Sequence, residues 1–557
     1  MSRTLHPYIP RLVEQYETRA VSRREFLRTA TLLGMAAGSA YAVAGLSPTA
    51  TALAQGTPRQ GGTLRIATTV YDVNAPWTAT TTAHPLIYSQ VVEHLTRTGA
   101  DSVTRPNLLS GWAPSEDLQT WTLSLRDGVK WHSGRPFTAE DVIWNLTRLL
   151  SDEAGSSMLG LMKGYMLNEI DTGKTNESGR AIIRHELWDA NAIERVNDAT
   201  IRLNLKAPQL AVPEHLFHFP AVMLYPEDGG TFGVGRPGTG AFTLTEIDPG
   251  RRAVLEAVEG YWGEGPYLDR IEFIDVGGSE QAIANALASE QADAAFQVLP
   301  DYFPLLANRE HLQFYDVVTA DTAVVRMNVT QEPFGDARVR KAMRLSVDAQ
   351  QASDLTFGQF STAADHHHVS PIHPEYAEVP PMTRDVAAAR ALLAEAGHPD
   401  GIDITLTIQQ NPPHHLRNAT ALVEMWKEAG IRCEINIVPN AQYWDVWLTA
   451  PLGMTVWAHR PLAVINLSLA YRSGVAWNES GYANPEFDAL LDQAESIPDP
   501  VVRREVMAQL QTLMQEDGPL VQTYWRKLFT FCDKRVTGFQ MHPTYAVFGH
   551  ELGWSDA

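Results

Sequence analysis

Hydrophobic and polar positions along the chain form two kinds of run, which predict a mixed α/β protein. Helix 416–429 lies between strands 402–408 and 431–438, in the order of a βαβ unit. Such units are almost always right-handed and build a parallel sheet. We therefore expect an α/β second half. The other strand-like runs are 62–70, 241–247, 253–257 and 271–276, and the other helix-like runs are 84–95, 138–146, 336–347 and 385–396.

The first half carries more turn signals than the second. Trp121–Trp131 alternates and contains Asp127-Gly128, a pair typical of hairpin turns, so we expect a hairpin there. Residues 151–190 are harder to interpret, but 169–180 (EIDTGKTNESGR) is polar and rich in turn formers, which indicates an exposed insertion. A chain of 557 residues exceeds one ordinary core, and the Gly-Gly break at 277–278 is where we expect it to cross between domains.

The N-terminus has the form of an export signal. Ser22-Arg23-Arg24-Glu25-Phe26-Leu27 precedes a weakly apolar run from Ala30 to Leu46, and Ala52-Leu53-Ala54 reads as a cleavage site. These features resemble a twin-arginine signal peptide. The apolar run is too interrupted for a good membrane span. We expect residues 1–54 to be removed and the rest to be a soluble protein in the periplasm. The alternative is a plain amphipathic N-terminal helix.

Net charge and cysteines exclude several functions. The formal net charge of −21 argues against a partner that is a nucleic acid or an anionic membrane. Only Cys433 and Cys532 are present, and neither belongs to a C-x-x-C motif, so a zinc ribbon or redox motif is not expected. Both cysteines lie in apolar strand-like stretches and are interpreted as buried thiols.

Several motifs are too weak to assign chemistry. Gly233, Gly235 and Gly238 spell G-x-G-x-x-G, but a strand follows instead of a helix, so a turn is favoured over a nucleotide site. His414-His415 is interpreted as surface. No catalytic machinery is visible, so we predict no enzyme and no cofactor. Weak metal candidates are His366, His367 and His368, with His373 nearby, and the alternatives for them are a polar cavity or a solvated loop.

Five stretches together resemble the solute-binding receptors of ATP-driven importers, in the family that includes oligopeptide, dipeptide and nickel receptors. They are 108–142 (LLSGWAPSEDLQTWTLSLRDGVKWHSGRPFTAEDV), 238–250 (GTGAFTLTEIDPG), 327–348 (MNVTQEPFGDARVRKAMRLSVD), 388–406 (AARALLAEAGHPDGIDITL) and 480–491 (SGYANPEFDALL). The likeness covers essentially all of 60–557. It implies a two-lobed periplasmic binding protein fold of cluster C type, with an extra subdomain on lobe I and a ligand enclosed by hinge closure.

The resemblance also implies a domain plan and partners. Lobe I would span 55–275 with a subdomain at about 98–205, lobe II 276–526, and residues 527–557 would return to lobe I. The partners would be a small-molecule ligand and the permease subunits of an ABC importer, and we expect a monomer. A nickel or metal-chelate receptor, a signalling receptor and a secreted hydrolase on the same scaffold stay as alternatives.

One departure from the family pattern bears on the ligand. In peptide-binding relatives a tryptophan near the end of a second-lobe strand is followed, three residues on, by an aspartate that takes the peptide ammonium group. Trp457 matches the tryptophan, but Arg460 stands at the position of the aspartate, beside His459. An anionic or oxygen-rich solute is therefore favoured over a free peptide. The alternative is that Arg460 pairs with a carboxylate of the protein and shapes the cleft. The other candidate ligand contacts are Trp477, Asn466, Asn478 and Tyr482, with Trp77 and His84 from lobe I.

Overall fold

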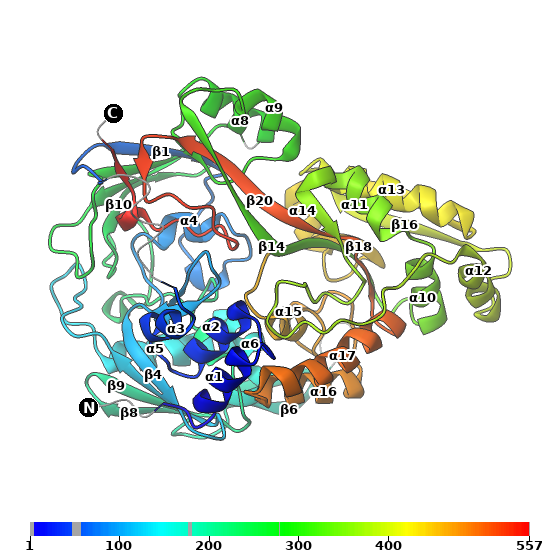
Figure 1. Cartoon of the computed structure of the whole chain (residues 1–557), viewed down its shortest axis with the longest axis horizontal. Coiled ribbons are helices and arrows are strands. Elements are labelled where there is room, and N and C mark those ends of the chain that lie inside the picture. The colour runs from blue at the N-terminus through cyan, green and yellow to red at the C-terminus, as the bar shows by residue number, and fades with distance from the viewer. Residues whose placement is uncertain (1–4, 47–56, 176–180, 278, 556–557) are drawn as a thin grey trace. The chain divides into compact units, whose positions relative to one another are not determined.

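The computed structural model divides the chain into two compact units. It describes residues 5–46, 57–175, 181–277 and 279–555. Unit 1 comprises Met1–Val317 and Phe529–Ala557, and unit 2 comprises Val318–Leu528. The long strands β14 (Leu312–Met327) and β20 (Tyr524–Asp533) carry the chain across (Figure 1).

The first crossing therefore lies near 317, and the predicted crossing near 275 is wrong. After the predicted break the chain stays in unit 1, where β13 (Ala294–Ala295) pairs in parallel with β1 (Thr63–Thr68). The second crossing lies near 528, close to the predicted 527.

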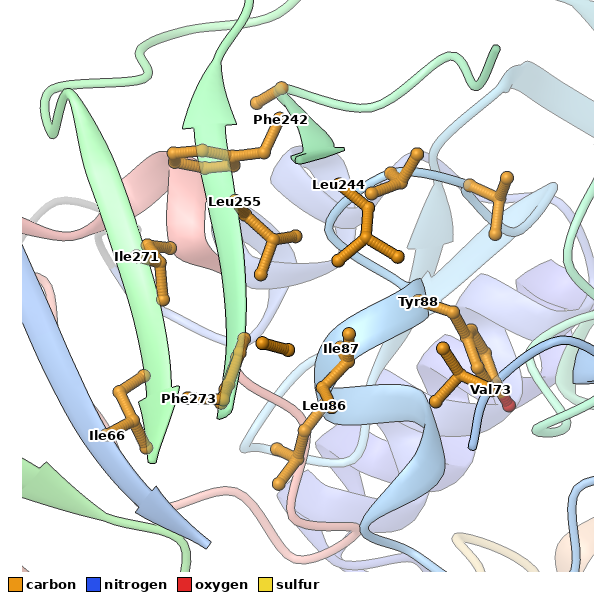
Figure 2. Close-up of a cluster of buried hydrophobic side chains, with 14 of the residues drawn as sticks. Ile66, Val73, Leu86, Ile87, Tyr88, Phe242, Leu244, Leu255, Ile271 and Phe273 are labelled. Atoms are coloured by element: carbon orange, nitrogen blue, oxygen red, sulfur yellow. The ribbon is translucent and has the colours of Figure 1, made fainter. Parts of the chain in front are cut away.

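Unit 1 is built on a mixed sheet with the strand order β10-β11-β12-β1-β13, followed by the end of β20. The pairs β10–β11 and β11–β12 are antiparallel, whereas β1 is parallel to β12 and β13. Apolar side chains of the sheet, among them Phe242, Leu255 and Phe273, pack against Leu86 and Ile87 of helix α4 (Figure 2). The bounds not yet given are β10 Phe242–Asp248, β11 Arg252–Ala257, β12 Arg270–Asp275 and α4 His84–Tyr88.

A separate sheet in unit 1, with the order β4-β5-β9-β8, falls within the predicted subdomain range of 98–205. Strand β5 pairs with β4 and β9, so the hairpin predicted at Trp121–Trp131 is wrong. The indole N–H of buried Trp131 instead donates a hydrogen bond to Asp141, which belongs to the capping box that starts helix α5. The bounds are β4 Leu109–Pro114, β5 Thr120–Leu125, β8 Ile193–Asn197, β9 Thr200–Asn204 and α5 Ala139–Leu149.

The insertion predicted at 169–180 is exposed over nearly all of its described residues, 169–175. Helix α6 (Ser157–Met166) is largely buried, and the hairpin β6–β7 (Leu167–Thr175 and Ala181–Leu187) carries the exposed residues. The other elements of unit 1 are β2 Thr96–Thr98, β3 Thr104–Pro106, α7 Val212–His215, α8 Glu280–Ala288, α9 Phe303–Leu306, β21 Val536–Thr537 and β22 Gly553–Trp554.

Unit 2 contains the βαβ unit that the sequence predicts. Strands β16 (Ile402–Gln409) and β17 (Ile431–Val438) are parallel in full register, and α13 (His414–Glu428) connects them. The sheet continues through β18 (Leu452–Trp457) to β14. Residue 430 has φ +83°, the left-handed conformation that suits the glycine ending α13. The remaining bounds are α10 Ala337–Leu345, α11 Ala349–Phe357, β15 Ser361–Ala363, α12 Val386–Glu395, α14 Asn440–Val446, α15 Ala463–Ala470, α16 Pro485–Ser496, α17 Pro500–Glu516 and β19 Leu520–Val521.

The N-terminal segment is helical in the described range and belongs to unit 1. It forms α1 (Ile9–Glu17), α2 (Arg23–Leu32) and α3 (Ala37–Val43). The predicted cleavage site Ala52-Leu53-Ala54 lies outside the described residues. No helix in the described ranges is long and apolar enough to cross a membrane.

Gly238, which ends the G-x-G-x-x-G run, lies in the buried turn before β10, as the turn interpretation expects. A Cβ there would come within 1.8 Å of the Val91 carbonyl oxygen. We expect Gly238→Ala to lower the free energy of unfolding by about 2 kcal/mol or more, since neither backbone segment can move away without cost. Chemical denaturation checks this. Gly335→Ala, where the nearest atom would lie at 3.4 Å, is the control; equal losses in both variants contradict the steric explanation.

Candidate functional site

The candidate site residues of unit 2 gather where strand β18 ends. The strand is almost entirely buried and pairs with β14, with Thr322 opposite Trp457. The chain leaves the sheet after Trp457 and enters α15 at Ala463 (Figure 1). This short connection holds His459 and Arg460 at the carboxyl end of a central strand.

A buried carboxylate fixes the position of Trp457. Glu479 is 2% exposed, and its Oε1 accepts a hydrogen bond from the Trp457 indole at 3.0 Å. Its Oε2 accepts from Thr455 Oγ1 at 2.6 Å and from Trp447 Nε1 at 2.5 Å. The fully buried Arg326 adds an ion pair with a 3.0 Å distance between Nε and Oε2. The indole N–H of Trp457 is therefore already hydrogen-bonded within the protein, and only the apolar part of the ring remains to contact a ligand.

His459 and Arg460 are both buried. His459 Nδ1 accepts a hydrogen bond from the Ala320 amide at 3.1 Å, which assigns the proton of a neutral ring to Nε2. The Arg460 guanidinium donates to the carbonyls of Ala458 and His459 at 3.2 and 3.1 Å. Burial lowers the pKa of Arg460 to about 10, and the charge of Asp321 opposes that shift. The group therefore stays cationic at neutral pH.

The charged neighbours of Arg460 come from the two crossing strands. Asp321 is fully buried on β14, and its Oδ1 lies 2.5 Å from Arg526 Nε on β20. Sequence reasoning did not select either residue. A signal was present, because a charged side chain within an apolar strand must be paired or lie at a site.

Aromatic rings extend from Trp457 in two directions. Half-buried Trp477 lies 6.0 Å from the Trp457 ring in an edge-to-face arrangement. On the other side the His368 ring lies 5.8 Å from Trp457 and stacks on Trp525 at 5.9 Å. His368 Nδ1 is also 2.8 Å from the hydroxyl of Tyr471. The cluster brings the predicted Trp457 and Trp477 together with His368, and adds Trp525 and Tyr471, which sequence reasoning missed.

The remaining candidates of unit 2 differ in what they have left to offer a ligand. The side-chain amide of Asn478 donates to the carbonyls of Arg472 and Tyr482 and accepts from Ser480, so it shapes its own loop. The Tyr482 hydroxyl donates to Asp517 at 2.8 Å. Asn466, fully buried on α15, has no hydrogen-bond partner for either side-chain atom within the part of the chain that the structure describes.

The two candidates of unit 1 lie in or shortly before helix α4. Trp77 is half-buried and has the Arg148 guanidinium 3.8 Å from its ring centre. His84 opens α4, and its Nδ1 lies 2.9 Å from Thr81 Oγ1. Burial lowers the pKa of His84. Both side chains thus have partners within unit 1.

The histidine-rich segment is buried, so the solvated-loop interpretation is wrong. His366, His367 and His368 are each at most 1% exposed, and burial lowers the pKa of each to about 3. His366 Nδ1 accepts a hydrogen bond from the backbone N–H of Gln522 at 2.9 Å, and His367 Nδ1 accepts one from the backbone N–H of Val369 at 3.2 Å. No group of three or more His, Cys, Asp or Glu side chains that could hold a metal ion occurs within the described ranges.

The histidine pair at 414–415 is also predicted to be exposed, and the two cysteines to be buried. His414 and His415 are both buried at the start of α13, so their interpretation as surface residues is wrong. Both cysteines are free thiols. Cys532 is buried, as expected, whereas Cys433 on β17 is only partly buried.

Comparisons with known proteins agree on one family. The family model for bacterial extracellular solute-binding proteins, family 5 Middle, matches residues 104–471. The glutathione-binding protein GsiB of Salmonella typhi is 25% identical over 491 residues, covering 84% of this chain and 90% of that protein. The dipeptide-binding protein DppE of Bacillus subtilis is 25% identical over 492 residues, covering 84% and 87%.

Solved structures show the same fold. AgaA of A. tumefaciens R10, in complex with agropinic acid, has a TM-score of 0.77 at 20% identity, covering 89% of this chain and 99% of that chain. DppA of Helicobacter pylori, in complex with the peptide STSA, has a TM-score of 0.75 at 18% identity, covering 89% and 99%. Both are periplasmic binding proteins, so the two-lobed α/β fold expected from the sequence is confirmed.

Burial of the neutral histidines predicts a pH dependence. A folded pKa near 3 lies below the unfolded value of about 6.5, so the stabilisation is complete above pH 6.5 and is lost as the pH falls toward 3. Each histidine contributes up to about 1.4 kcal/mol per pH unit in that window. Chemical denaturation at pH 7.5 and 5.5 should show lower stability at 5.5, and His367→Gln should reduce the difference.

The partly exposed His398 provides the control for that measurement. His398→Gln should leave the difference between pH 7.5 and 5.5 unchanged. Equal stability of the unsubstituted protein at the two pH values would contradict the burial of neutral rings.

Proposed function

Since this chain belongs to the bacterial extracellular solute-binding proteins of family 5, and is a substrate-binding receptor of an ABC importer, we propose that its ligand is an anionic or oxygen-rich solute, which includes acylated peptide-like compounds. We further propose that it acts in the periplasm as a monomer, exported by the twin-arginine-like signal and cleaved near Ala54, and that it is not an enzyme.

The observation that carries the ligand proposal is the guanidinium of Arg460 at the end of β18. The group is buried and keeps its charge, since the pKa of about 10 lies well above neutral pH. A ligand ammonium placed beside it would meet like charge in a medium that screens poorly. A carboxylate or phosphate would find a planar donor whose geometry matches two of its oxygens. The charge of the site therefore favours acids over free amines.

Neighbouring groups suit the rest of such a solute. The Asn466 amide is buried without a hydrogen-bond partner in the described chain, and a buried amide in that state is costly. A solute that carries both donors and acceptors would satisfy it. The half-buried ring of Trp477 offers a face for apolar or sugar-like parts. Polar atoms and aromatic rings together are the usual lining of a small-molecule site.

The ligands named for related proteins support an acidic or peptide-like ligand. One curated relative is a glutathione-binding protein, and one structural neighbour is in complex with agropinic acid. The nickel alternative has its own support, because NikZ of Campylobacter jejuni, in complex with Ni(L-His), has a TM-score of 0.74. The buried segment 366–368 argues against direct metal binding, as its rings already accept backbone hydrogen bonds through Nδ1 at 366 and 367.

A ligand panel tests the proposal. We expect N-acylated dipeptides, sugar acids or sugar phosphates to raise the unfolding temperature of the protein, and free dipeptides and tripeptides to leave it unchanged. A ligand at a hundred times its Kd stabilises the folded state by about 2.7 kcal/mol. Thermal unfolding at pH 7.5 measures the shift. Stabilisation by free peptides, with none from any anionic solute, would overturn the charge argument.

Matched arginine variants separate the site from general charge effects. Arg460→Gln should abolish the ligand-induced shift. Arg338→Gln removes the same charge from an exposed residue of unit 2 that is paired with Asp336, and should retain the shift. If both variants respond to the ligand as the unsubstituted protein does, Arg460 has no role in binding.

Titration calorimetry decides the metal alternative. We expect neither nickel nor zinc, with or without added L-histidine, to give a saturable heat at pH 7.5. Heat that disappears in a His366→Gln and His368→Gln double variant would assign the ion to this segment and replace the anionic-solute proposal.

A further inference from the structure

The N-terminal segment Leu5–Leu46 is packed into unit 1. All residues of α2 from Phe26 to Leu32 are buried, although α2 is only ten residues long. Tyr16 of α1 stacks on Phe26 with ring centres 4.8 Å apart, so α1 covers one side of α2. Helix α2 also contacts β3 and α7 of unit 1. A helix buried all round is part of a core.

Unit 1 supplies hydrogen bonds that the segment needs. Leu32 is the last residue of α2, where a helix leaves its carbonyl groups without internal partners. The indole of Trp112, on β4, donates to this carbonyl at 2.9 Å. The chain then turns at Gly34, which has φ +88°, and a Cβ there would lie 2.9 Å from the Trp112 carbonyl oxygen. The end of α2 is therefore fitted closely to one strand.

A second polar contact holds α3. The hydroxyl of Tyr41 is hydrogen-bonded to Asp101 and accepts from Arg105 at 2.9 Å. The Arg105 guanidinium also lies 5.6 Å from the Tyr41 ring centre. Burial and the Asp101 carboxylate raise the pKa of Tyr41 to about 12, as expected for a hydroxyl that donates to an anion. Trp112, Asp101 and Arg105 thus form a receiving surface for α2 and α3.

The arginine pair is the part of the segment that packing leaves free. Arg23 and Arg24 are exposed at the start of α2, whereas Phe26 and Leu27 directly behind them are buried. Positive charge in the first turn opposes the helix dipole. A capping box offsets this, since Ser22 accepts from the Glu25 amide and the Glu25 carboxylate from the Ser22 amide.

We propose that the N-terminal segment is a docked intramolecular partner of unit 1 in the uncleaved chain, held by the surface of Trp112, Asp101 and Arg105. A helix as short as α2 is marginal in water by itself, so its structure depends on docking. Docking buries the first part of the apolar run, residues 30–33 with Met35, and leaves Arg23 and Arg24 open to an acidic partner. Release of the segment uncovers Trp112. The inference goes beyond ligand binding and does not depend on Arg460.

Hydrogen exchange on the full chain, purified uncleaved from the cytoplasm, tests the docking. We expect the backbone amides of residues 26–33 to exchange about 100-fold or more slowly than those of an unstructured peptide. Trp112→Phe keeps the ring and removes one hydrogen bond, so exchange in this stretch should become roughly three- to ten-fold faster. Tyr41→Phe gives an independent second perturbation, on the half-buried contact of α3, should Trp112→Phe fold poorly.

Trp188→Phe is the matched control. The indole of Trp188 also donates to a backbone carbonyl of unit 1, that of Asn204 at 2.7 Å, but it has no contact with the segment among the hydrogen bonds described. This variant should leave exchange at 26–33 unchanged. Exchange at unstructured rates in the unsubstituted chain would overturn the proposal. Protection that persists unaltered in both Trp112→Phe and Tyr41→Phe would overturn it equally, because the receiving surface would then hold nothing.

Discussion

The ion pair of Arg326 and Glu479 is the interaction on which the candidate site depends. Two charges removed from water cost several kcal/mol each unless hydrogen bonds replace their hydration. Glu479 receives three further donors, and Arg326 donates to the carbonyls of Ala450 and Trp447. The pair therefore connects β14, the end of β18, the end of α14 and the loop before α16. Loss of one partner would leave the other charge buried and would release all four segments.

This network explains why the end of β18 is a firm place for a ligand contact. Trp457 and Thr455 both donate hydrogen bonds to Glu479, so the last residues of the strand are held in register with β14. The connection that follows starts from a fixed point, and Arg460 folds back on the carbonyls of Ala458 and His459. A side chain placed in advance loses little freedom when a ligand arrives, which favours affinity.

Local signals in the sequence predict those parts of the fold that depend on residues close together along the chain. The βαβ unit of unit 2 follows from hydrophobic spacing and from Gly430, whose position after a helix requires positive φ. Helix α5 follows from its capping box. The turn at Asp127-Gly128 forms, but the hairpin does not, because β5 is already paired on both edges and the indole of Trp131 is hydrogen-bonded to Asp141. Tertiary pairing decided the strand partners despite a correct turn signal.

The candidate site shows the same contrast between local signals and contacts that are distant along the chain. The sequence locates Trp457, His459 and Arg460, because residue types that are unusual for a strand end are visible one at a time. It does not show their partners, since Asp321 and Glu479 lie far from them along the chain and only the sheet brings them near. The buried histidines show the same limit, because three adjacent imidazoles suggest a polar surface. Backbone amides of 369 and 522 instead satisfy two of the rings inside the core.

The role of Arg460 follows from weighing these partners against the ligand. Backbone carbonyls orient the guanidinium of Arg460, and the charge of Asp321 on β14 favours its cationic form. A cation held in this way is electrostatically preorganised, so that an acid approaching it gains attraction without much rearrangement of the site. An amine would instead have to displace or neutralise the guanidinium. Under the proposed function, specificity against free peptides would arise chiefly from repulsion, which discriminates between solutes of equal size more sharply than shape does.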